Sequence, residues 1–514
     1  MSVFQLGENI KKNIIFAQLN AGNIKKHPIF VPTNQNDIIM ERLIGRDKES
    51  ALLDKYMASN RPEFIAIYGR RRVGKTFLIR RHFQDQFDFY VTGIINGTFE
   101  NEMDAFNLAL NRYGYNGPAA STWMQAFAIL GDLLKNKSVN QHRRCIVFID
   151  ELPCFDTRNS GFVRALDYFW NSQGAWIDNI MFIVCGSATS WMIRKVINNH
   201  GGLHNRVTHE IHLKPFTLYQ TEQFFAERGG NWDRMSILQT YMAMGGVPYY
   251  LGFVDTEYSA AENIDRLFFD DMAEMRNEYS RLFQSLFSQP DKYMDIVKLL
   301  SENKKGLTRK QIAEKLNLPN NGHLGDMLDD LQYCDFVRQY SNGNKINNVI
   351  YQLIDFYTLF YHQFCRRPKT DRHYWRNTIG TPTQNTWYGL AYERVCMSHI
   401  QQIIYALRLD YIHTEFYSWR SKKSTPAAQI DIIIDRADGI VTICEVKYSK
   451  AEYVLLKEEY EKIMNRVEAF VRETNCKKGT QTIIITTKGM KPTGYSEISN
   501  RTITLDDLFT EVPQ

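Results

Sequence analysis

The segment from Gly69 to Thr76 reads GRRRVGKT and carries the residue types that bind phosphate. Two glycines frame four residues, and a lysine and a hydroxyl residue follow, as in the pattern G-x-x-x-x-G-K-[ST]. The glycines let backbone amides close around phosphate oxygens, and the helix that begins here adds its dipole. We expect Lys75 to reach the β- and γ-phosphates of ATP and Thr76 to give Mg²⁺ a hydroxyl ligand. The residues predicted to form this nucleotide site are Gly69, Arg70, Arg71, Arg72, Val73, Gly74, Lys75 and Thr76.

Two acids, Asp150 and Glu151, follow the apolar run CIVFI. An acid at the tip of a buried strand is costly unless it meets a cation. Asp150 is therefore predicted to hold Mg²⁺ through water, and Glu151 to act as the catalytic base that polarises the attacking water. Ser187, in the GSA that ends the next apolar run, is a candidate sensor of the γ-phosphate, although a serine that begins a turn has the same pattern.

Arginines are the candidates for neutralising charge in the transition state of ATP hydrolysis. Arg206 and the three loop arginines could do so within one chain or across a subunit boundary. Most arginines are solvated surface residues, and a plain surface role is therefore the alternative for each of these four.

A third group of polar residues lies in AQIDIIIDRADGIVTICEVKYS, residues 428–449. A three-residue loop at 437–439, with glycine last, suits a type I turn followed by a bulge and sets Asp431 directly opposite Glu445. Lys447 lies two residues beyond Glu445 and therefore on the same face. A two-residue loop would instead place the two acids on opposite sides of the sheet.

Two facing carboxylates repel each other unless a cation lies between them, and Mg²⁺ or Mn²⁺ suits oxygen ligands. Asp431 and Glu445 are predicted metal ligands, with the carbonyl of Val446 completing the inner shell. Lys447 would orient or deprotonate a water aimed at a phosphodiester phosphorus. Gln429 shares a face with Asp431 and could contact substrate or metal shell. The alternative is a charged hairpin in an interaction domain, because Glu-x-Lys is common on strands.

The elements that must position these groups alternate between strand and helix. EFIAIYG, CIVFID (145–150) and MFIVCGSA (181–188) are short apolar strands separated by helical segments. This order predicts an α/β fold, with a P-loop NTPase parallel sheet in residues 41–216 covered on both faces. Residues 217–290 are helix-rich and are predicted to form a helical lid.

Residues 291–360 show three helices followed by two strands around an Asn-Gly-type turn in SNGN, the pattern of a winged helix. Its third helix is acidic for a DNA recognition helix, so a purely packing role is the alternative. Basic side chains instead lie near the start of the second helix, at Lys304, Lys305, Arg309 and Lys310. Residues 361–379 are predicted as a linker, and 380–514 as a final α/β unit whose opening helix includes YERVC.

Composition sets the broader limits. The 514 residues are 44% hydrophobic and 23% charged, with a net charge of +5, so a soluble protein of several units is expected. The eight scattered cysteines contain no C-x-x-C pair, which favours a reduced, cytoplasmic protein without a zinc cluster. No apolar run approaches membrane-spanning length, so no membrane partner is expected. Residues 1–40 carry little pattern and are predicted as an extension.

Six segments in order, ERLIGRDKE, GRRRVGKT, VFIDE, VCGSATSWM, HLKPF and GGVPYYL, resemble the archaeal-type (DEXX-box) P-loop ATPases, often grouped with AAA+ or STAND-like ATPases. The resemblance covers about residues 41–514. It implies a winged helix and a C-terminal domain of the PD-(D/E)xK nuclease superfamily, whose motif positions match Asp431, Glu445 and Lys447. Glu393, in YERVC, matches the acidic position that often assists the metal there.

These patterns lead to a leading hypothesis and two alternatives. The first is an ATPase whose nucleotide state controls a metal-dependent nuclease that acts on DNA, or less favourably on RNA. The second is an ATP-dependent switch that binds DNA or a protein through the winged helix and uses a non-catalytic C-terminal domain for docking. The third is a ring-forming motor, which would need an arginine from a neighbouring subunit. A homo-oligomer is therefore left open.

Overall fold

The computed structural model describes residues 43–140, 143–198, 203, 205–341, 349–366, 371–421 and 428–513. The predicted extension, residues 1–40, and the turn predicted in SNGN (341–344), apart from Ser341, lie outside the described residues.

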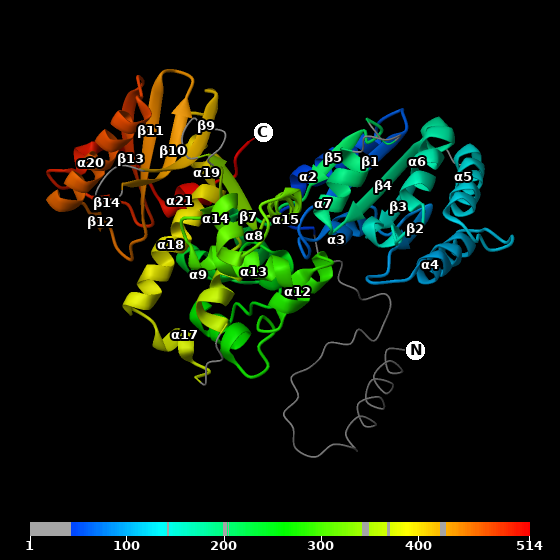
Figure 1. The fold of residues 1–514 in the computed structure, drawn as a ribbon, viewed down its shortest axis with the longest axis horizontal. Coiled ribbons are helices and arrows are strands. Elements are labelled where there is room, and N and C mark those ends of the chain that lie inside the picture. The colour runs from blue at the N-terminus through cyan, green and yellow to red at the C-terminus, as the bar shows by residue number, and fades with distance from the viewer. Residues whose placement is uncertain are drawn as a thin grey trace, which may run out of the picture. The chain divides into compact units, whose positions relative to one another are not determined.

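The first sheet is parallel and carries the nucleotide loop on an interior strand, β1 (Glu63–Tyr68; Figure 1). Its order is β2 (Phe89–Thr92), β3 (Cys145–Asp150), β4 (Ile180–Gly186), β1 and β5 (His209–His212). Phe64 and Ala66 enter one buried cluster while Ile65 and Ile67 enter another, so both faces of β1 are covered. A strand buried on both faces needs a continuous apolar run, which explains EFIAIY. The predicted parallel α/β sheet is confirmed.

Helices cover this sheet on both faces. α2 (Asp47–Met57) and α3 (Lys75–His82) contribute Leu53 and Leu78 to one cluster. The other cluster is covered by α4 (Phe99–Arg112), α5 (Trp123–Asn140) and α6 (Phe162–Ser172).

The chain is largely helical from Leu218 to Leu286, as the lid prediction requires. The helices here are α8 (Leu218–Glu227), α9 (Arg234–Met244), α10 (Pro248–Leu251), α11 (Ala260–Ile264) and α12 (Glu278–Leu286). Three helices and a small antiparallel sheet of order β6-β8-β7 follow. They are α13 (Pro290–Glu302), β6 (Leu307–Thr308), α14 (Arg309–Leu316), α15 (Gly322–Tyr333), β7 (Val337–Ser341) and β8 (Val349–Leu353).

The segment predicted as a linker, 361–379, is packed over the part that the structure describes. It contains α17 (Tyr374–Asn377), and the side chain of Trp375 is only 1% exposed. The backbone N–H of Trp375 donates to Asp265 Oδ1 at 2.7 Å. The basic composition and proline of RRPKTDRHYWR suggested exposure, but buried Phe364 and Trp375 and the ion pair of Arg376 with Asp265 pack the segment against the core.

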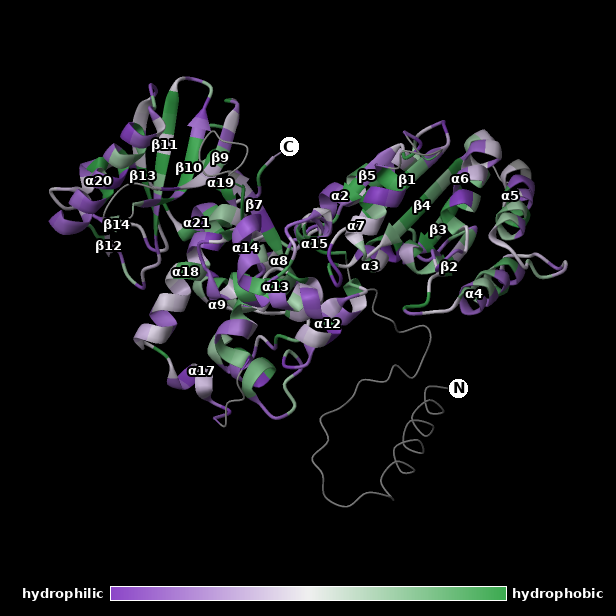
Figure 2. Cartoon of the chain, in the orientation of Figure 1, coloured by the Kyte–Doolittle hydropathy of each residue, from purple (hydrophilic) through white to green (hydrophobic). Residues whose placement is uncertain are grey.

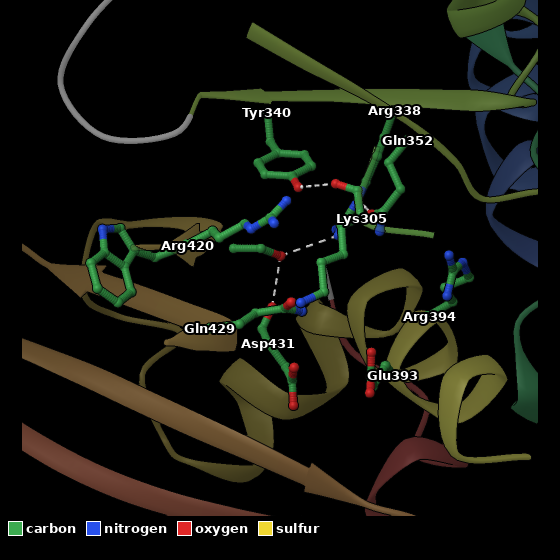
Figure 3. A pocket seen from close by; sticks show the side chains of 11 residues that line it. Lys305, Arg338, Tyr340, Gln352, Glu393, Arg394, Arg420, Gln429 and Asp431 are labelled. Atoms are coloured by element: carbon green, nitrogen blue, oxygen red, sulfur yellow. Dashed lines mark hydrogen bonds between the residues drawn. The ribbon is translucent and has the colours of Figure 1, made fainter. Parts of the chain in front are cut away.

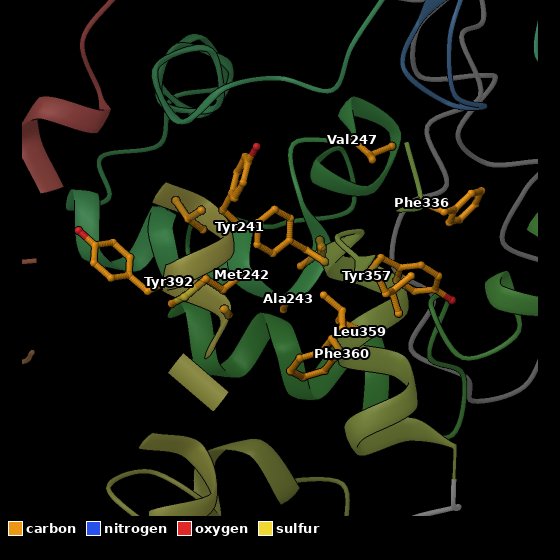
Figure 4. Packing of buried hydrophobic residues seen from close by; sticks show 14 of the residues in the cluster. Tyr241, Met242, Ala243, Val247, Phe336, Tyr357, Leu359, Phe360 and Tyr392 are labelled. Carbon is orange, nitrogen blue, oxygen red and sulfur yellow. The ribbon is translucent and has the colours of Figure 1, made fainter. Parts of the chain in front are cut away.

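The units predicted after residue 216 share one hydrophobic core, which extends from Phe216 to Phe509. Figure 4 shows Tyr241 and Met242 of α9 in this core with Phe360 of α16 (Phe356–Phe360) and Tyr392 of α18 (Pro382–Ser398). The predicted boundaries at 290, 360 and 380 therefore do not separate independent cores.

The last unit holds a mixed five-stranded sheet whose strands carry apolar residues (Figure 2). The order is β15 (Ser499–Ile503), β13 (Gly479–Thr486), β11 (Ile440–Lys447), β10 (Gln429–Arg436) and β9 (Thr414–Arg420). One face packs against α18 and α19 (Ile400–Ala406), and the other against α20 (Lys457–Thr474). None of the described helices is long and apolar enough to cross a bilayer.

Candidate functional site

The nucleotide loop connects β1 to α3 through two glycines that the backbone requires. Gly69 has φ +141°, and a Cβ there would lie 2.3 Å from the carbonyl oxygen of Leu213. Gly74, the N-cap of α3, has φ +94°. Both conformations favour glycine. The buried Val73 between them is held through its carbonyl, which accepts a hydrogen bond from Arg46 at 2.9 Å.

Lys75 lies buried inside this loop. Its Nζ donates to the carbonyl oxygens of Gly69 at 2.8 Å and Arg70 at 3.0 Å. Burial lowers the pKa of the ammonium group. None of the described carboxylates lies within salt-bridge distance of its Nζ, although the charges of Glu151 and Asp150 act on it. The loop therefore fits a polyphosphate.

The predicted magnesium ligands are in contact. Thr76 Oγ1 donates to Asp150 Oδ2 at 2.8 Å, and the other oxygen of Asp150 accepts from the Cys185 thiol at 2.6 Å. Burial is the main cause that raises the pKa of Asp150. A hydroxyl and a carboxylate beside bound phosphates form the oxygen donor set that Mg²⁺ prefers, so these residues fit the ion. The contact of Cys185 with Asp150 was not predicted, because Cys185 lies in an apolar strand and resembles an ordinary core residue.

Glu151 is held by Ser187, the residue predicted to sense the γ-phosphate. Ser187 donates its hydroxyl to Glu151 Oε1 at 2.7 Å and its backbone N–H to Oε2 at 3.1 Å. Glu151 has φ +46°, a left-handed conformation that is uncommon for a residue with a Cβ and that often accompanies functional sites. Ser187 thus contacts the predicted catalytic base directly.

Two of the loop arginines are engaged by residues far along the chain. Arg70 forms a buried ion pair with Asp355, the N-cap of α16. Arg72 pairs with Glu278 at 2.6 Å, and its guanidinium lies 4.1 Å from the centre of the Tyr249 ring.

Neither acidic partner, Asp355 or Glu278, was predicted, although an aspartate before the apolar run FYTLF is a typical helix cap. Of the other candidate arginines, Arg71 is half-buried and Arg206 is exposed in the turn before β5.

The hairpin has the predicted register. Ile432 pairs with Cys444 and Ile433 with Ile443, and the same register places Asp431 opposite Glu445. Gly439 supplies the left-handed conformation, φ +85°, that the three-residue loop requires. The predicted turn length is therefore confirmed by the pairing of the two strands.

A β-bulge at Asp431 was not predicted. The pairing of β10 with β9 shifts between Ile430 and Ile433, and Ser418 Oγ donates to the Asp431 carbonyl at 2.7 Å. Bulges redirect side chains near active sites. Asp431 Oδ2 accepts from the Val446 N–H at 3.4 Å, and Figure 3 shows its carboxylate in the same pocket as Glu393 of α18.

Burial raises the pKa of Asp431 well above its usual value, and the charges of Glu393 and Glu445 raise it further. Burial likewise raises the pKa of Glu393, with Glu445 adding to it. Three carboxylates thus act on one another electrostatically at the end of β11. Such a group is stabilised by protons or by a cation.

Glu445 is paired with cationic side chains. Its Oε1 lies 2.8 Å from Lys447 Nζ and 2.6 Å from Arg466 Nη1, and Lys447 also contacts Glu459 at 2.7 Å. Burial acts to lower the pKa of Lys447, but Glu445 and Glu459 raise it overall, which favours orienting a water over deprotonating one. Among the residues that the structure describes, no group of three or more His, Cys, Asp or Glu is placed to hold a metal ion.

Arg466 and Glu459 were not found from the sequence. They lie on α20, seven residues apart, and so project from the same face two turns apart. Only the fold brings that face against the end of β11.

Residues 43–254 match a family model described as the ATPase domain predominantly from Archaea. The chain contains an ATPase domain of the archaeal type. The match begins before α2 and ends after α10, so it includes the nucleotide loop, Asp150, Glu151 and Ser187. Domains of this family generally use ATP and Mg²⁺, in agreement with the loop geometry.

The chain is also similar to the uncharacterized protein MJECL04 of Methanocaldococcus jannaschii, with 25% identity over 270 residues, half of this chain. The match spans 54% of that relative's length. Among solved structures, the Walker-type ATPase PABY2304 of Pyrococcus abyssi is 18% identical with a TM-score of 0.45, covering 62% of this chain and 96% of that one. Cdc6p of Pyrobaculum aerophilum is 16% identical with a TM-score of 0.30, covering 65% and 95%.

Proposed function

We propose that this protein hydrolyses ATP and that its nucleotide state controls a metal-dependent nuclease site in residues 380–514, acting on DNA. The observation that carries the ATPase half is the contact of Thr76 with Asp150 beside the buried Lys75. The nuclease half rests on Asp431, which lies opposite Glu445 by register and interacts electrostatically with Glu393.

In the ATPase half each residue has a defined task. Lys75 and the loop amides hold the β- and γ-phosphates, and Thr76 and Asp150 hold Mg²⁺. Held by these two residues, Mg²⁺ would supply positive charge beside the phosphates. Glu151 accepts a proton from the attacking water, and Ser187 fixes the direction of that carboxylate.

In the nuclease half Asp431 and Glu445 would hold one Mg²⁺ or Mn²⁺, assisted by Glu393 and with the Val446 carbonyl as a further ligand. A divalent cation relieves the repulsion that raises the pKa of Asp431. To bind metal, Glu445 must exchange its contact with Arg466. The ion would supply a polarised water, and Lys447 would orient it.

A chain of contacts connects the two halves. Arg70 of the nucleotide loop pairs with Asp355, which lies two residues after Leu353 of β8. The Leu353 carbonyl accepts from Arg394 Nε at 3.2 Å, and Arg394 adjoins Glu393. A change in the loop can therefore reach the carboxylate site through buried groups. We interpret residues 290–353 as a winged helix that packs between the halves.

Paired activity assays test this proposal. Purified protein should hydrolyse ATP, and Lys75→Ala should abolish hydrolysis. With Mg²⁺ or Mn²⁺ it should cut DNA, and Asp431→Ala should stop cutting, whereas the control Glu497→Ala, an exposed acid of the same unit, should not. If neither DNA nor RNA is cut in any nucleotide state, the nuclease half fails.

The alternative is an ATP-dependent switch with a non-catalytic C-terminal unit. The paired state of Glu445, held by Lys447 and Arg466, favours it because these cations already neutralise the acid. Calorimetric titration with Mg²⁺ and Mn²⁺ separates the two. Metal binding that is lost in Asp431→Asn supports the nuclease. Absence of metal binding supports the switch. A homo-oligomer using the exposed Arg206 also remains a proposal, which sedimentation with and without ATP tests.

A further inference from the structure

A small pocket with a cavity volume of about 30 Å³, open to solvent, is lined by the β7–β8 ribbon and by β9, β10 and α18 (Figure 3). Four cationic side chains and two carboxylates lie on its wall: Lys305, Arg338, Arg394, Arg420, Glu393 and Asp431. The two carboxylates belong to the proposed nuclease site. The cations come from both the 290–353 unit and the C-terminal unit, and none of them has a role in the chemical steps proposed above.

Arg338, on β7, is a largely buried guanidinium with neutral partners. Its Nε donates to Gln352 Oε1 at 2.8 Å, and its Nη2 donates to Ser418 Oγ at 3.2 Å. Its Cζ lies 5.2 Å from the centre of the Tyr340 ring. Burial lowers the pKa of Arg338 to about 10. Within the described part of the chain, no carboxylate forms a salt bridge with it.

Arg394, on α18, is likewise buried and hydrogen-bonded to neutral groups. It donates to three carbonyl oxygens, of Leu353 at 3.2 Å, Leu390 at 3.0 Å and Lys304 at 3.1 Å. Burial is the main cause that lowers its pKa. A buried cation is costly unless an anion compensates it. Glu393 acts electrostatically on both cations. No described carboxylate forms a salt bridge with either, so their charge leaves room for compensation by a negatively charged ligand.

We propose that this pocket binds a backbone phosphate of a single-stranded nucleic acid beside the carboxylate site, with β7 supplying one wall. The inference rests on the proposed function and adds its substrate class. Arginine binds phosphate through two parallel hydrogen bonds, and basic grooves hold single strands by their backbone. A flexible single strand can bend its backbone into a recess walled by two units, which a stiff duplex does less readily.

Binding of labelled 20-nucleotide DNA and RNA single strands, in EDTA so that nothing is cut, tests the pocket. Fluorescence anisotropy over a range of salt concentrations should show about tenfold weaker binding for Arg338→Met. The slope of log K against log salt should also become shallower by about 0.7, the loss of one phosphate contact. The control Arg501→Met removes an exposed arginine from β15, at the opposite edge of the sheet, and should bind as wild type.

Retained melting temperature and ATPase rate show that Arg338→Met folds. If it does not, Lys305→Met, at an exposed lysine of the same pocket, replaces it in the assay. Binding and slope equal to wild type in a folded variant overturn the inference. So does equal, Arg338-dependent binding of a duplex of the same sequence. Arg338-dependent binding of inorganic phosphate without oligonucleotide binding would overturn it too, by assigning the pocket to a free anion.

The outcomes also separate this inference from the nuclease proposal. Single-strand binding that depends on Arg338 without cutting in any nucleotide state supports the pocket and rejects the nuclease. Cutting with unchanged binding and KM in Arg338→Met supports the nuclease and rejects the pocket.

Discussion

Replacing Asp355 by asparagine tests whether the nucleotide loop depends on residues nearly 300 positions away. Asp355 has two roles: one oxygen pairs with Arg70, and the other accepts from the N–H of Thr358 at 2.9 Å to cap α16. Asparagine is as good a cap as aspartate, so the variant removes the charge and keeps the cap. Arg70 then remains buried, with a side chain 2% exposed, and without its carboxylate.

The magnitude follows from the burial of both partners. Removing one partner of a buried ion pair costs about 3–5 kcal/mol, because the other charge stays desolvated. The ring of Phe336, 5.0 Å from the Arg70 guanidinium, offsets part of this, so we expect about 3 kcal/mol. At about 1.4 kcal/mol per factor of ten, the local opening equilibrium between loop and α16 should rise roughly a hundredfold.

Hydrogen exchange is the suitable assay, because a chain with several units need not unfold in one step. Amides of α16 and of the nucleotide loop should exchange about a hundred times faster in Asp355→Asn. Asp233→Asn is the matched control, since Asp233 caps α9 but is exposed. Arg70→Met combined with Asp355→Asn should recover part of the protection, because no unpaired charge remains. Unchanged exchange in the single variant, or no recovery in the double variant, would refute the reasoning.

Three further predictions concern the two sites. The pKa of Asp431 is raised by folding, so its contribution to stability is present while it is protonated and is lost as pH rises through that pKa. Asp431→Asn should therefore melt higher than wild type above neutral pH, and Mg²⁺ should raise the melting temperature of wild type more than that of the variant. Ser187→Ala frees Glu151 and should lower kcat for ATP about tenfold with little change in ATP affinity, measured by phosphate release. Arg466→Met releases Glu445 and should strengthen Mn²⁺ binding several-fold by calorimetry; weaker binding would argue against a metal ligand there.

The features that the sequence predicted well are local ones. The nucleotide loop needs glycines at fixed positions, a strand before it and a helix after it, all within 20 residues of sequence. The register of the β10–β11 hairpin is equally local, because the turn length alone decides which residues face each other. Asp431 could be placed opposite Glu445 for that reason.

The contacts that were not predicted connect distant segments. Nothing near Arg70 indicates that its partner is Asp355, and nothing near Glu445 indicates Arg466, because each pairing depends on how whole units pack. The bulge at Asp431 arises from a mismatch with β9, a strand beyond the predicted hairpin. The linker was misjudged because its composition is basic, while its packing depends on buried residues such as Phe364 and Trp375.

The hydrogen bonds of Lys75 give a physical reason why ATP binding should affect the carboxylate site. Its Nζ now donates to the carbonyls of Gly69 and Arg70, and a bound phosphate would draw those hydrogen bonds away. The Arg70 backbone would then readjust while its side chain is held by Asp355, so the strain passes to α16. A non-hydrolysable ATP analogue should therefore change hydrogen exchange in both α16 and α18 of wild type. In the Arg70→Met, Asp355→Asn double variant the change in α18 should vanish while ATP still binds. A persistent response in α18 would show that the signal takes another route.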